Sequence, residues 1–318
     1  MASLALHHRV RPALVVPVLV LLALLPPVLL KLDEPFYLVL ASRVMIFALA
    51  ATSLNLLVGF GGMVSFGHAA FFGAGAYVVG IAATHGIQSA WVAWPLAMAV
   101  SGVAALLIGA ISLRTRGVYF IMITLAFAQM MYFIFVSLKT YGGEDGLALE
   151  KRSTLGFGLD LKSDATFYYV VLVVVCVVLA LLWRVVNARF GRVLQGIREN
   201  EARMEAVGFP VYVHKLGAFV LAGAIAGLAG AMAANQNDMA SPAFLNWTQS
   251  GSLLIMVILG GVGTFLGPAL GAAALLLLEE FVAEYTVHFQ FFVGAILLAV
   301  VLLLPNGLAT FTFGKKRG

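Results

Sequence analysis

Residues 189–208 read RFGRVLQGIRENEARMEAVG and form the one long charged segment of an otherwise apolar chain. Apolar side chains recur in this segment at helical spacing, with Asn200 completing the rhythm: Val193, Ile197, Met204 and Val207. Charged side chains occupy the opposite side: Arg192, Arg198, Glu199, Glu201, Arg203 and Glu205. The pattern predicts an amphipathic helix of about four turns.

The end of this helix is marked by Gly208, with Pro210 just beyond it. Glycine readily adopts the left-handed backbone that closes a helix, and proline cannot continue one. A charged amphipathic helix between two membrane spans can lie against another protein. We therefore interpret residues 187–214 as a cytoplasmic coupling loop, through which a motor protein in the cytoplasm would move this chain. The loop lies within a single transmembrane domain, residues 1–318.

The composition of the 318-residue chain places it in a lipid bilayer. It is 62% hydrophobic and 10% charged, with a mean hydropathy of +1.04, whereas soluble domains carry about a quarter charged residues. A pI near 9.4 could suggest nucleic acid, but the basic residues flank apolar runs, and membrane topology explains them better. Cys176 is the single cysteine, so an internal disulfide is excluded.

Apolar runs of the length that crosses a bilayer, roughly 17–25 residues, recur along the chain. They lie near residues 11–30, 36–58, 68–84, 90–112, 117–138, 165–186, 215–235, 249–263, 264–284 and 287–304. The eighth run is too short and too rich in glycine for an ordinary span, so we expect about 8–10 spans. The sequence thus predicts an all-α, polytopic transmembrane helical bundle.

Positively charged residues set the orientation of the chain. With the N-terminus in the cytoplasm, the inner segments hold 13 of the 19 Lys and Arg residues against three acids. The outer segments hold five Lys and Arg residues against eleven acids. Because loops rich in Lys and Arg stay on the cytoplasmic side, both termini are expected inside. Residues 139–164 then form the long periplasmic loop.

Two glycine-rich stretches, here named the first and second glycine breaks, interrupt the apolar runs. The first spans residues 59–67 (GFGGMVSFG) and the second residues 259–271 (LGGVGTFLGPALG). When the two breaks are aligned, Gly61-Gly62 matches Gly260-Gly261, and Ser65-Phe66 matches Thr264-Phe265. Similar breaks in two halves are typical of repeats whose interrupted helices line a transport pathway. The alternative is close packing of helices through small residues.

Polar residues near the first break are candidates for the pathway, because non-helical backbone at membrane depth survives only where protein or water satisfies it. We expect Asn55, Ser65 and His68 to face the pathway. The break residues expected to line it with them are Gly61, Gly62, Gly260, Gly261 and Thr264. A lone histidine is also commonly hydrogen-bonded in place. No second His, Cys or carboxylate stands at ligand spacing, so no metal site is expected.

A turn in the outer loop displays two carboxylates. Residues 142–147 read GGEDGL, with glycines on both sides of Glu144 and Asp145, a composition typical of a tight turn. The turn is either a solvated loop or a docking surface for a soluble partner outside the membrane, and the sequence leaves both interpretations open.

The function classes narrow to transport. The chain has no G-x-x-x-x-G-K-[ST] phosphate loop, nucleophile elbow or metal-spaced histidine pair, so we expect neither an enzyme nor a bound cofactor. An ion-driven carrier usually needs acids inside the membrane, and the cores of these runs contain no Asp or Glu. A passive channel would leave the coupling loop without a purpose. An ATP-driven permease accounts for both observations, because its driving force enters from a separate ATPase.

Several motifs resemble the permeases of branched-chain amino acid ABC importers, and they keep their order between about residues 50 and 305. The segments that carry the resemblance are 67–77 (GHAAFFGAGAY), 143–147 (GEDGL), 190–208, 214–216 (HKL), 226–231 (AGLAGA) and 259–263 (LGGVG). The outer glutamate-bearing turn is more similar to the M-type permease than to its H-type sister.

The resemblance implies a bacterial inner-membrane subunit that is itself in contact with membrane lipid. Its protein partners would be a homologous permease, two cytoplasmic ABC ATPases and a periplasmic substrate-binding protein. ATP and Mg²⁺ would be bound by the ATPases. In this family the coupling helix occupies the loop at 187–214. Its polar ATPase contacts would be Arg192, Arg198, Glu199, Glu201 and Glu205, with Gly208 ending the helix. The family also takes up other, related amino acids, and close relatives move urea, short amides or aromatic acids. These substrates, and an ATP-independent channel for small amides or urea, remain alternatives.

Overall fold

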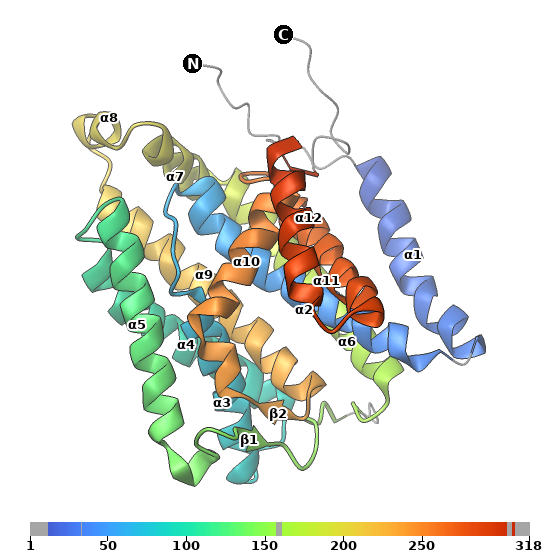
Figure 1. Cartoon of the computed structure of the whole chain (residues 1–318). Helices are drawn as coiled ribbons and strands as arrows, with labels where there is room; N and C mark the ends of the chain where they lie inside the picture. The colour runs from blue at the N-terminus through green and yellow to red at the C-terminus, as the bar shows by residue number, and fades with distance from the viewer. Residues whose placement is uncertain (1–11, 33, 157–160, 304–306, 309–318) are drawn as a thin grey trace.

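The computed structural model describes residues 12–32, 34–156, 161–303 and 307–308, which are almost entirely helical (Figure 1). The α-helices are α1 (Pro12–Lys31), α2 (Pro35–Asn55), α3 (His68–Thr84), α4 (Ala90–Ser112), α5 (Val118–Ser137), α6 (Asp164–Asn187), α7 (Arg189–Glu199), α8 (Glu201–Ala206), α9 (Val211–Gln236), α10 (Trp247–Gly260), α11 (Gly267–Tyr285) and α12 (Phe289–Leu303). The short elements are the π-helical turn η1 (Leu56–Phe60), the 3-10 turns η2 (Lys139–Tyr141) and η3 (Pro242–Leu245), and the antiparallel strands β1 (Leu147–Ala148) and β2 (Met239–Ala240). The predicted all-α bundle is confirmed.

Most of these helices are suited to a lipid environment. Within the described residues, five are long and apolar enough to cross a bilayer: α2 continued by η1, α4, α5, α6 and α9. Shorter apolar helices are α1, α3, α10 and α12. Together with α11, their bounds lie within a few residues of the ten predicted apolar runs, so the chain is a multi-pass membrane protein.

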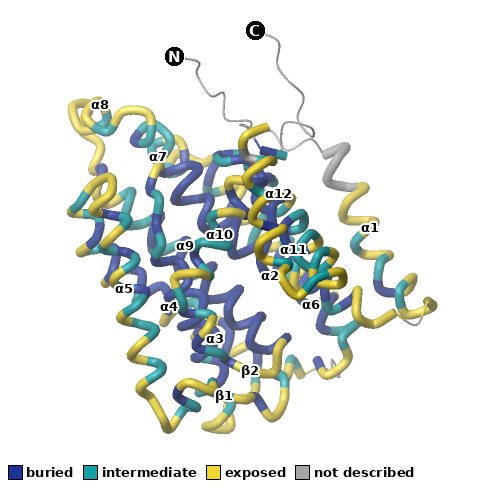
Figure 2. Tube along the Cα trace, viewed as in Figure 1, coloured by how far each residue is buried: buried dark blue, intermediate teal, exposed yellow. Residues whose placement is uncertain are grey.

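The centre of the bundle is formed by α2, α3 and α9, which are buried along most of their length (Figure 2). Helices that are apolar on all sides belong in such an interior. Small residues let α3 and α9 approach closely, since a Cβ added at Gly75 would lie 2.0 Å from the carbonyl oxygen of Gly227. The α5 helix, by contrast, is the least buried of the five spans.

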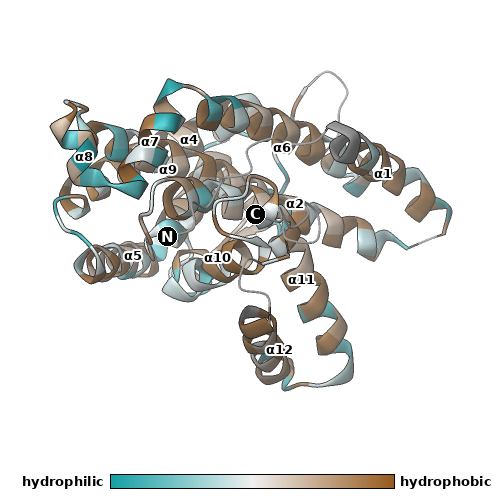
Figure 3. Cartoon of the chain, turned by 90° about the horizontal axis from the view of Figure 1, so that it is seen from above, coloured by the Kyte–Doolittle hydropathy of each residue, from teal (hydrophilic) through white to brown (hydrophobic). Residues whose placement is uncertain are grey.

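The two ends of the bundle carry different elements. The coupling segment, α7 and α8, lies at the same end as the start of α1 and the end of α12 (Figure 1). Seen from this end, α7 and α8 carry hydrophilic stretches beside mostly hydrophobic helices (Figure 3). The strands β1 and β2 lie at the opposite end. Residues 1–11 and 309–318, on which the predicted cytoplasmic termini depend, lie outside the described residues.

Both glycine breaks interrupt the helices, as predicted. The α2 helix ends in η1, and residues 61–67 are not helical until α3 begins. This segment descends from the level of α7 to the start of α3, partway into the bundle (Figure 1). In the second break, residues 261–266 separate α10 from α11. Protein encloses most of the irregular backbone, as membrane depth requires.

Candidate functional site

The coupling segment is two helices rather than one. Between α7 and α8, Asn200 has an extended backbone, with φ −158° and ψ 98°. Its side-chain Oδ1 accepts a hydrogen bond from the backbone amide of Arg203 at 2.9 Å and caps α8. The prediction of one continuous helix over residues 189–208 is therefore wrong, because the short polar side chain of Asn200 ends one helix and starts another. Gly208, with φ 94°, ends α8 as predicted.

The buried face of this segment also differs from the predicted one. The buried residues of α7 are Gly191, Leu194 and Ile197. Of the predicted apolar residues, Val193 is half-exposed and Val207 is 68% exposed. The spacing does not continue through Asn200, because the helical geometry is interrupted there.

Two of the predicted ATPase contacts, Glu201 and Glu205, are engaged within the chain. The carboxylate of Glu201 accepts from Nζ of Lys215 at 2.6 Å and lies 3.3 Å from Nη2 of Arg116. Glu205 lies 3.7 Å from the same Arg116 nitrogen. These ion pairs connect α8 to the start of α9 and to the turn between α4 and α5. Any contact between these acids and an ATPase stays a prediction.

The three remaining predicted ATPase contacts all lie in α7, and their side chains point in two directions. Arg192 and Glu199 are exposed, and neither makes an ion pair with the described part of the chain. Arg198 is half-buried, and its Nη1 donates a hydrogen bond to the carbonyl oxygen of Gly59 in η1. The coupling segment thus presents Arg192 and Glu199 outward and contacts the first glycine break through Arg198.

The side chain of Asn55 joins the two glycine breaks. It is fully buried. Its Nδ2 donates to the carbonyl oxygen of Thr264 at 2.8 Å, and its Oδ1 accepts from the amide of Gly263 at 3.0 Å. The side-chain amide of Asn55 thus provides hydrogen-bond partners for two backbone groups of the second glycine break. Its predicted place on the pathway stays a prediction, since the side chain here is held against the second break.

Ser65 and His68 are also enclosed by protein. Oγ of Ser65 accepts from the amide of Gly67 at 3.1 Å. The Ser53 hydroxyl donates to the carbonyl oxygen of Ala50, so it accepts from Nε2 of His68, at 2.7 Å. Nδ1 of His68 is buried and has no hydrogen-bond partner among the described residues. Neither side chain is exposed in the single chain, and their role in the pathway stays untested.

The other predicted pathway residues lie at the two breaks. Gly61, Gly260 and Gly261 are buried, Thr264 is half-buried, and Gly62 is exposed. Beside Gly62, Val64 and Phe66 are half-exposed, and neither was predicted as a site residue. No sequence pattern marks them, because the alternation of exposed and buried positions along residues 62–67 is seen only in the structure.

The predicted docking turn presents its carboxylates to solvent. Glu144 and Asp145 are both exposed. The three glycines around them have positive φ angles: Gly142, Gly143 and Gly146. The composition therefore forms the tight turn that it predicts, while docking of a periplasmic protein on it stays a prediction.

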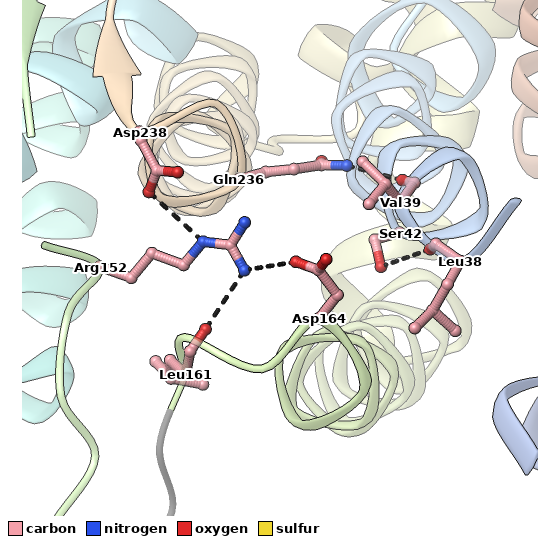
Figure 4. Close-up of polar contacts among 8 residues, drawn as sticks. All are labelled: Leu38, Val39, Ser42, Arg152, Leu161, Asp164, Gln236 and Asp238. Atoms are coloured by element: carbon pink, nitrogen blue, oxygen red, sulfur yellow. Dashed lines mark hydrogen bonds and ion pairs between the residues drawn. The ribbon is translucent and has the colours of Figure 1, made fainter. Parts of the chain in front are cut away.

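A polar cluster at the end of the bundle that carries β1 and β2 is not foreseen by the sequence patterns (Figure 4). The Arg152 side chain is 13% exposed and bonds to Oδ1 of Asp164 at 2.7 Å and Oδ1 of Asp238 at 3.3 Å. It also donates to the carbonyl oxygen of Leu161. The guanidinium thereby ties the outer loop to the start of α6 and to the residues after α9. The acids stand at helix ends, but no sequence pattern pairs them with Arg152.

The site has no metal-binding cluster within the part of the chain that the structure describes: no group of three or more His, Cys, Asp or Glu residues there could hold an ion. Its chemistry lies instead in backbone groups of the breaks and in the side chains that bind them.

Paired helix breaks inside an apolar bundle, with a charged helical segment at one end, define the class of the protein as a membrane transport protein. The chain belongs to the family of branched-chain amino acid transport system permease components, whose model matches residues 36–301. The family resemblance drawn from the motifs is confirmed.

Three relatives illustrate the similarity. The chain is 27% identical to the high-affinity branched-chain amino acid transport system permease protein LivM of Salmonella typhimurium and 26% identical to the Escherichia coli protein of the same name. Each match covers 297 residues, 86% of this chain and 70% of the relative. A probable branched-chain amino acid transport permease protein LivM of Methanocaldococcus jannaschii is 25% identical over 205 residues, 63% of this chain and 59% of the relative. No solved structure matches the chain significantly.

Proposed function

We propose that this chain is a permease subunit of an ATP-driven importer in a bacterial inner membrane, with both termini in the cytoplasm. It pairs with a homologous permease, and two cytoplasmic ABC ATPases bind ATP and Mg²⁺. A periplasmic binding protein delivers the substrate. Branched-chain amino acids are the proposed cargo, because the LivM relatives are permease proteins of high-affinity branched-chain amino acid transport systems.

The observation that carries this proposal is the coupling segment. The α7 helix exposes Arg192 and Glu199, which lack ion-pair partners among the described residues. Its opposite side is fastened to the first glycine break. A charged outer side suits a protein partner, since charge-assisted hydrogen bonds across an interface give orientation and specificity. An inner side attached to a helix break suits a segment that transmits movement.

The proposed cycle follows from these positions. Closure of the ATPases pulls the coupling segment and rocks the helices around the two breaks. The binding protein docks at the turn carrying Glu144 and Asp145 and releases its substrate between the two permeases. Selectivity lies mainly in the soluble binding protein, which agrees with the scarcity of charged side chains in the apolar runs.

The experiment that tests this proposal is uptake of labelled leucine into vesicles holding the complete assembly, with the binding protein outside and nucleotide inside. Uptake should require hydrolysable ATP and should be competed by isoleucine and valine. Equal uptake without ATP would point to the channel alternative. If urea, phenylalanine or an aromatic acid competed with the labelled solute and valine did not, the proposed cargo would be wrong. The proposed ATP-driven mechanism would still stand.

A further inference from the structure

The inner side of α7 rests directly on the first glycine break. Leu194 and Arg198 are one helical turn apart on this side. A Cβ added at Gly62 would lie 2.9 Å from Cγ of Arg198, and one added at Gly61 would lie 3.5 Å from Cδ1 of Leu194. The helix and the break are therefore in van der Waals contact, so neither can shift alone without opening a gap.

A charge-assisted hydrogen bond adds to this packing. The carbonyl of Gly59 belongs to the last turn of the helix formed by α2 and η1, where carbonyl groups lose their helical partners. The Arg198 guanidinium donates to that oxygen. A cation at a helix C-terminus is favourable, and a hydrogen bond from a charged donor is stronger than one between neutral groups. The bond thus fixes α7 to the end of α2.

The same glycine touches the second break. A Cβ added at Gly59 would lie 2.0 Å from Oδ1 of Asn55 and 2.6 Å from the amide nitrogen of Gly263. The Asn55 side chain then bonds to the amide of Gly263 and the carbonyl of Thr264. Arg198, Gly59 and Asn55 therefore form one unbroken series of contacts from α7 to both breaks.

Two further bonds extend this series into the helices beside the breaks. The amide of Phe66 donates to Oγ1 of Thr124 in α5, at 3.2 Å. The amide of Ala69 donates to Oγ of Ser250 in α10, at 2.8 Å. If the first break moves, these bonds transmit the displacement directly to α5 and to α10, and the bonds of Asn55 transmit it to the second break.

We propose that Arg198 and Asn55 are positioning residues that transmit displacement of the coupling segment to both glycine breaks, so that the two halves of the permease move together. This proposal rests on the ATP-driven import described above and departs from the expected role of Arg198 as an ATPase contact. Arg198 faces the permease interior, whereas Arg192 and Glu199 on the same helix face outward.

The test uses the complete assembly in vesicles and compares Arg198→Met, Arg198→Lys and Asn55→Leu with the native chain. Arg203→Met is the matched control, because Arg203 is exposed on α8 and no side-chain contact joins it to either break in the described structure. Three quantities are measured: the amount of assembled complex, basal ATP hydrolysis, and the substrate taken up per ATP hydrolysed.

Arg198→Met and Asn55→Leu should keep assembly and basal hydrolysis but lower the substrate taken up per ATP by about tenfold, a typical coupling effect. Arg198→Lys, which keeps a cationic donor, should restore part of the loss. The double variant should lose no more than the worse single variant, because residues acting in series are not additive. Native uptake per ATP in Arg198→Met, or additive losses in the double variant, would overturn the proposal.

A second measurement covers variants that fail to assemble. Spin labels at Val193→Cys in α7 and Val64→Cys in the first break, both half-exposed, are placed in a Cys176→Ala background. Their separation should change by less than about 2 Å between nucleotide states, the scale of an ordinary helix shift, while the coupling segment moves relative to α4. A larger change would overturn the connection. Native uptake that ignores ATP would instead overturn the proposed function, and this inference with it.

Discussion

Gly59 lies close against the second glycine break, and its missing side chain is what permits the contact. We expect Gly59→Ala to lower the thermal stability of the purified protein, since the added methyl group would overlap the Asn55 side chain and the amide of Gly263. Overpacking of this kind costs about 1–3 kcal/mol. The measurement is the midpoint of thermal unfolding in detergent.

The control for this substitution is Gly251→Ala in α10, where an added Cβ meets nothing within 4 Å. Alanine is favoured over glycine inside a helix by about 0.5–1 kcal/mol, so this variant should be unchanged or slightly more stable. An unfolding midpoint for Gly59→Ala equal to that of Gly251→Ala would contradict the close approach.

Side-chain partners were the hardest feature to foresee at this scale. The sequence indicates that Asn55, Ser65 and His68 stand near a glycine break, and the structure places all three there. Which groups they bind depends on segments as much as 209 residues away, and no local pattern carries that information. The same reason hides the bonds of Arg152.

At the scale of elements, α7 is the surface on which the proposed ATPase contact depends. Reversing two of its outward charges, Arg192→Glu with Glu199→Lys, should lower ATP hydrolysis stimulated by the loaded binding protein by about tenfold, because opposed charges at an interface become like charges. The permease should still fold, since neither side chain makes an ion pair within the described residues.

Glu201→Gln separates this effect from loosening of the coupling segment. It removes ion pairs to Lys215 and Arg116 within the chain and should speed amide exchange in α8 without reversing an outward charge. Normal stimulation in the charge-reversed variant, together with normal assembly, would argue against α7 as the ATPase contact.

The outer loop depends on Arg152. Arg152→Met should increase amide exchange at Leu149 and Thr154 by about tenfold, a local opening rather than global unfolding. These amides bond to the carbonyls of Asp238 and Gln88. Loss of the guanidinium would also leave two carboxylates close together, a repulsive arrangement.

Lys151→Met is the neighbouring control, because Lys151 is exposed and makes no ion pair with the described residues. Equal exchange in the two variants would show that the loop is held by its backbone bonds alone.

Helix boundaries in the apolar runs were predictable, since length and hydrophobicity suffice where lipid is the solvent. The coupling segment was harder. An asparagine at helical spacing is compatible both with a continuous helix and with a helix cap. The surrounding structure decides that Asn200 is a cap.

For the whole molecule, the distribution of Lys and Arg predicts which end faces the cytoplasm. In a Cys176→Ala background, an impermeant maleimide should label Glu144→Cys from outside intact cells. Glu199→Cys should be labelled only after the membrane is opened. Both parent residues are exposed in the single chain, so the membrane decides access to the reagent when the chain is expressed without its ATPases and binding protein. The reverse labelling pattern would show that the chain has the opposite orientation in the membrane.

The class of fold could be read from the sequence, because a mean hydropathy of +1.04 places the chain in a bilayer. The family was indicated by the resemblance of its motifs to those of known permeases. The cargo could not, since the polar groups at the breaks are engaged with the protein itself. The proposed pathway between two permeases also requires a second chain.

The most direct test of the whole account is solute flux through the purified chain in sealed vesicles, without ATPases or binding protein. Labelled leucine and urea should stay inside over the time in which the complete assembly, given ATP, fills its vesicles. Rapid leakage of either solute through the chain alone would show that it conducts unaided, and would contradict a permease that moves only when an ATPase moves it.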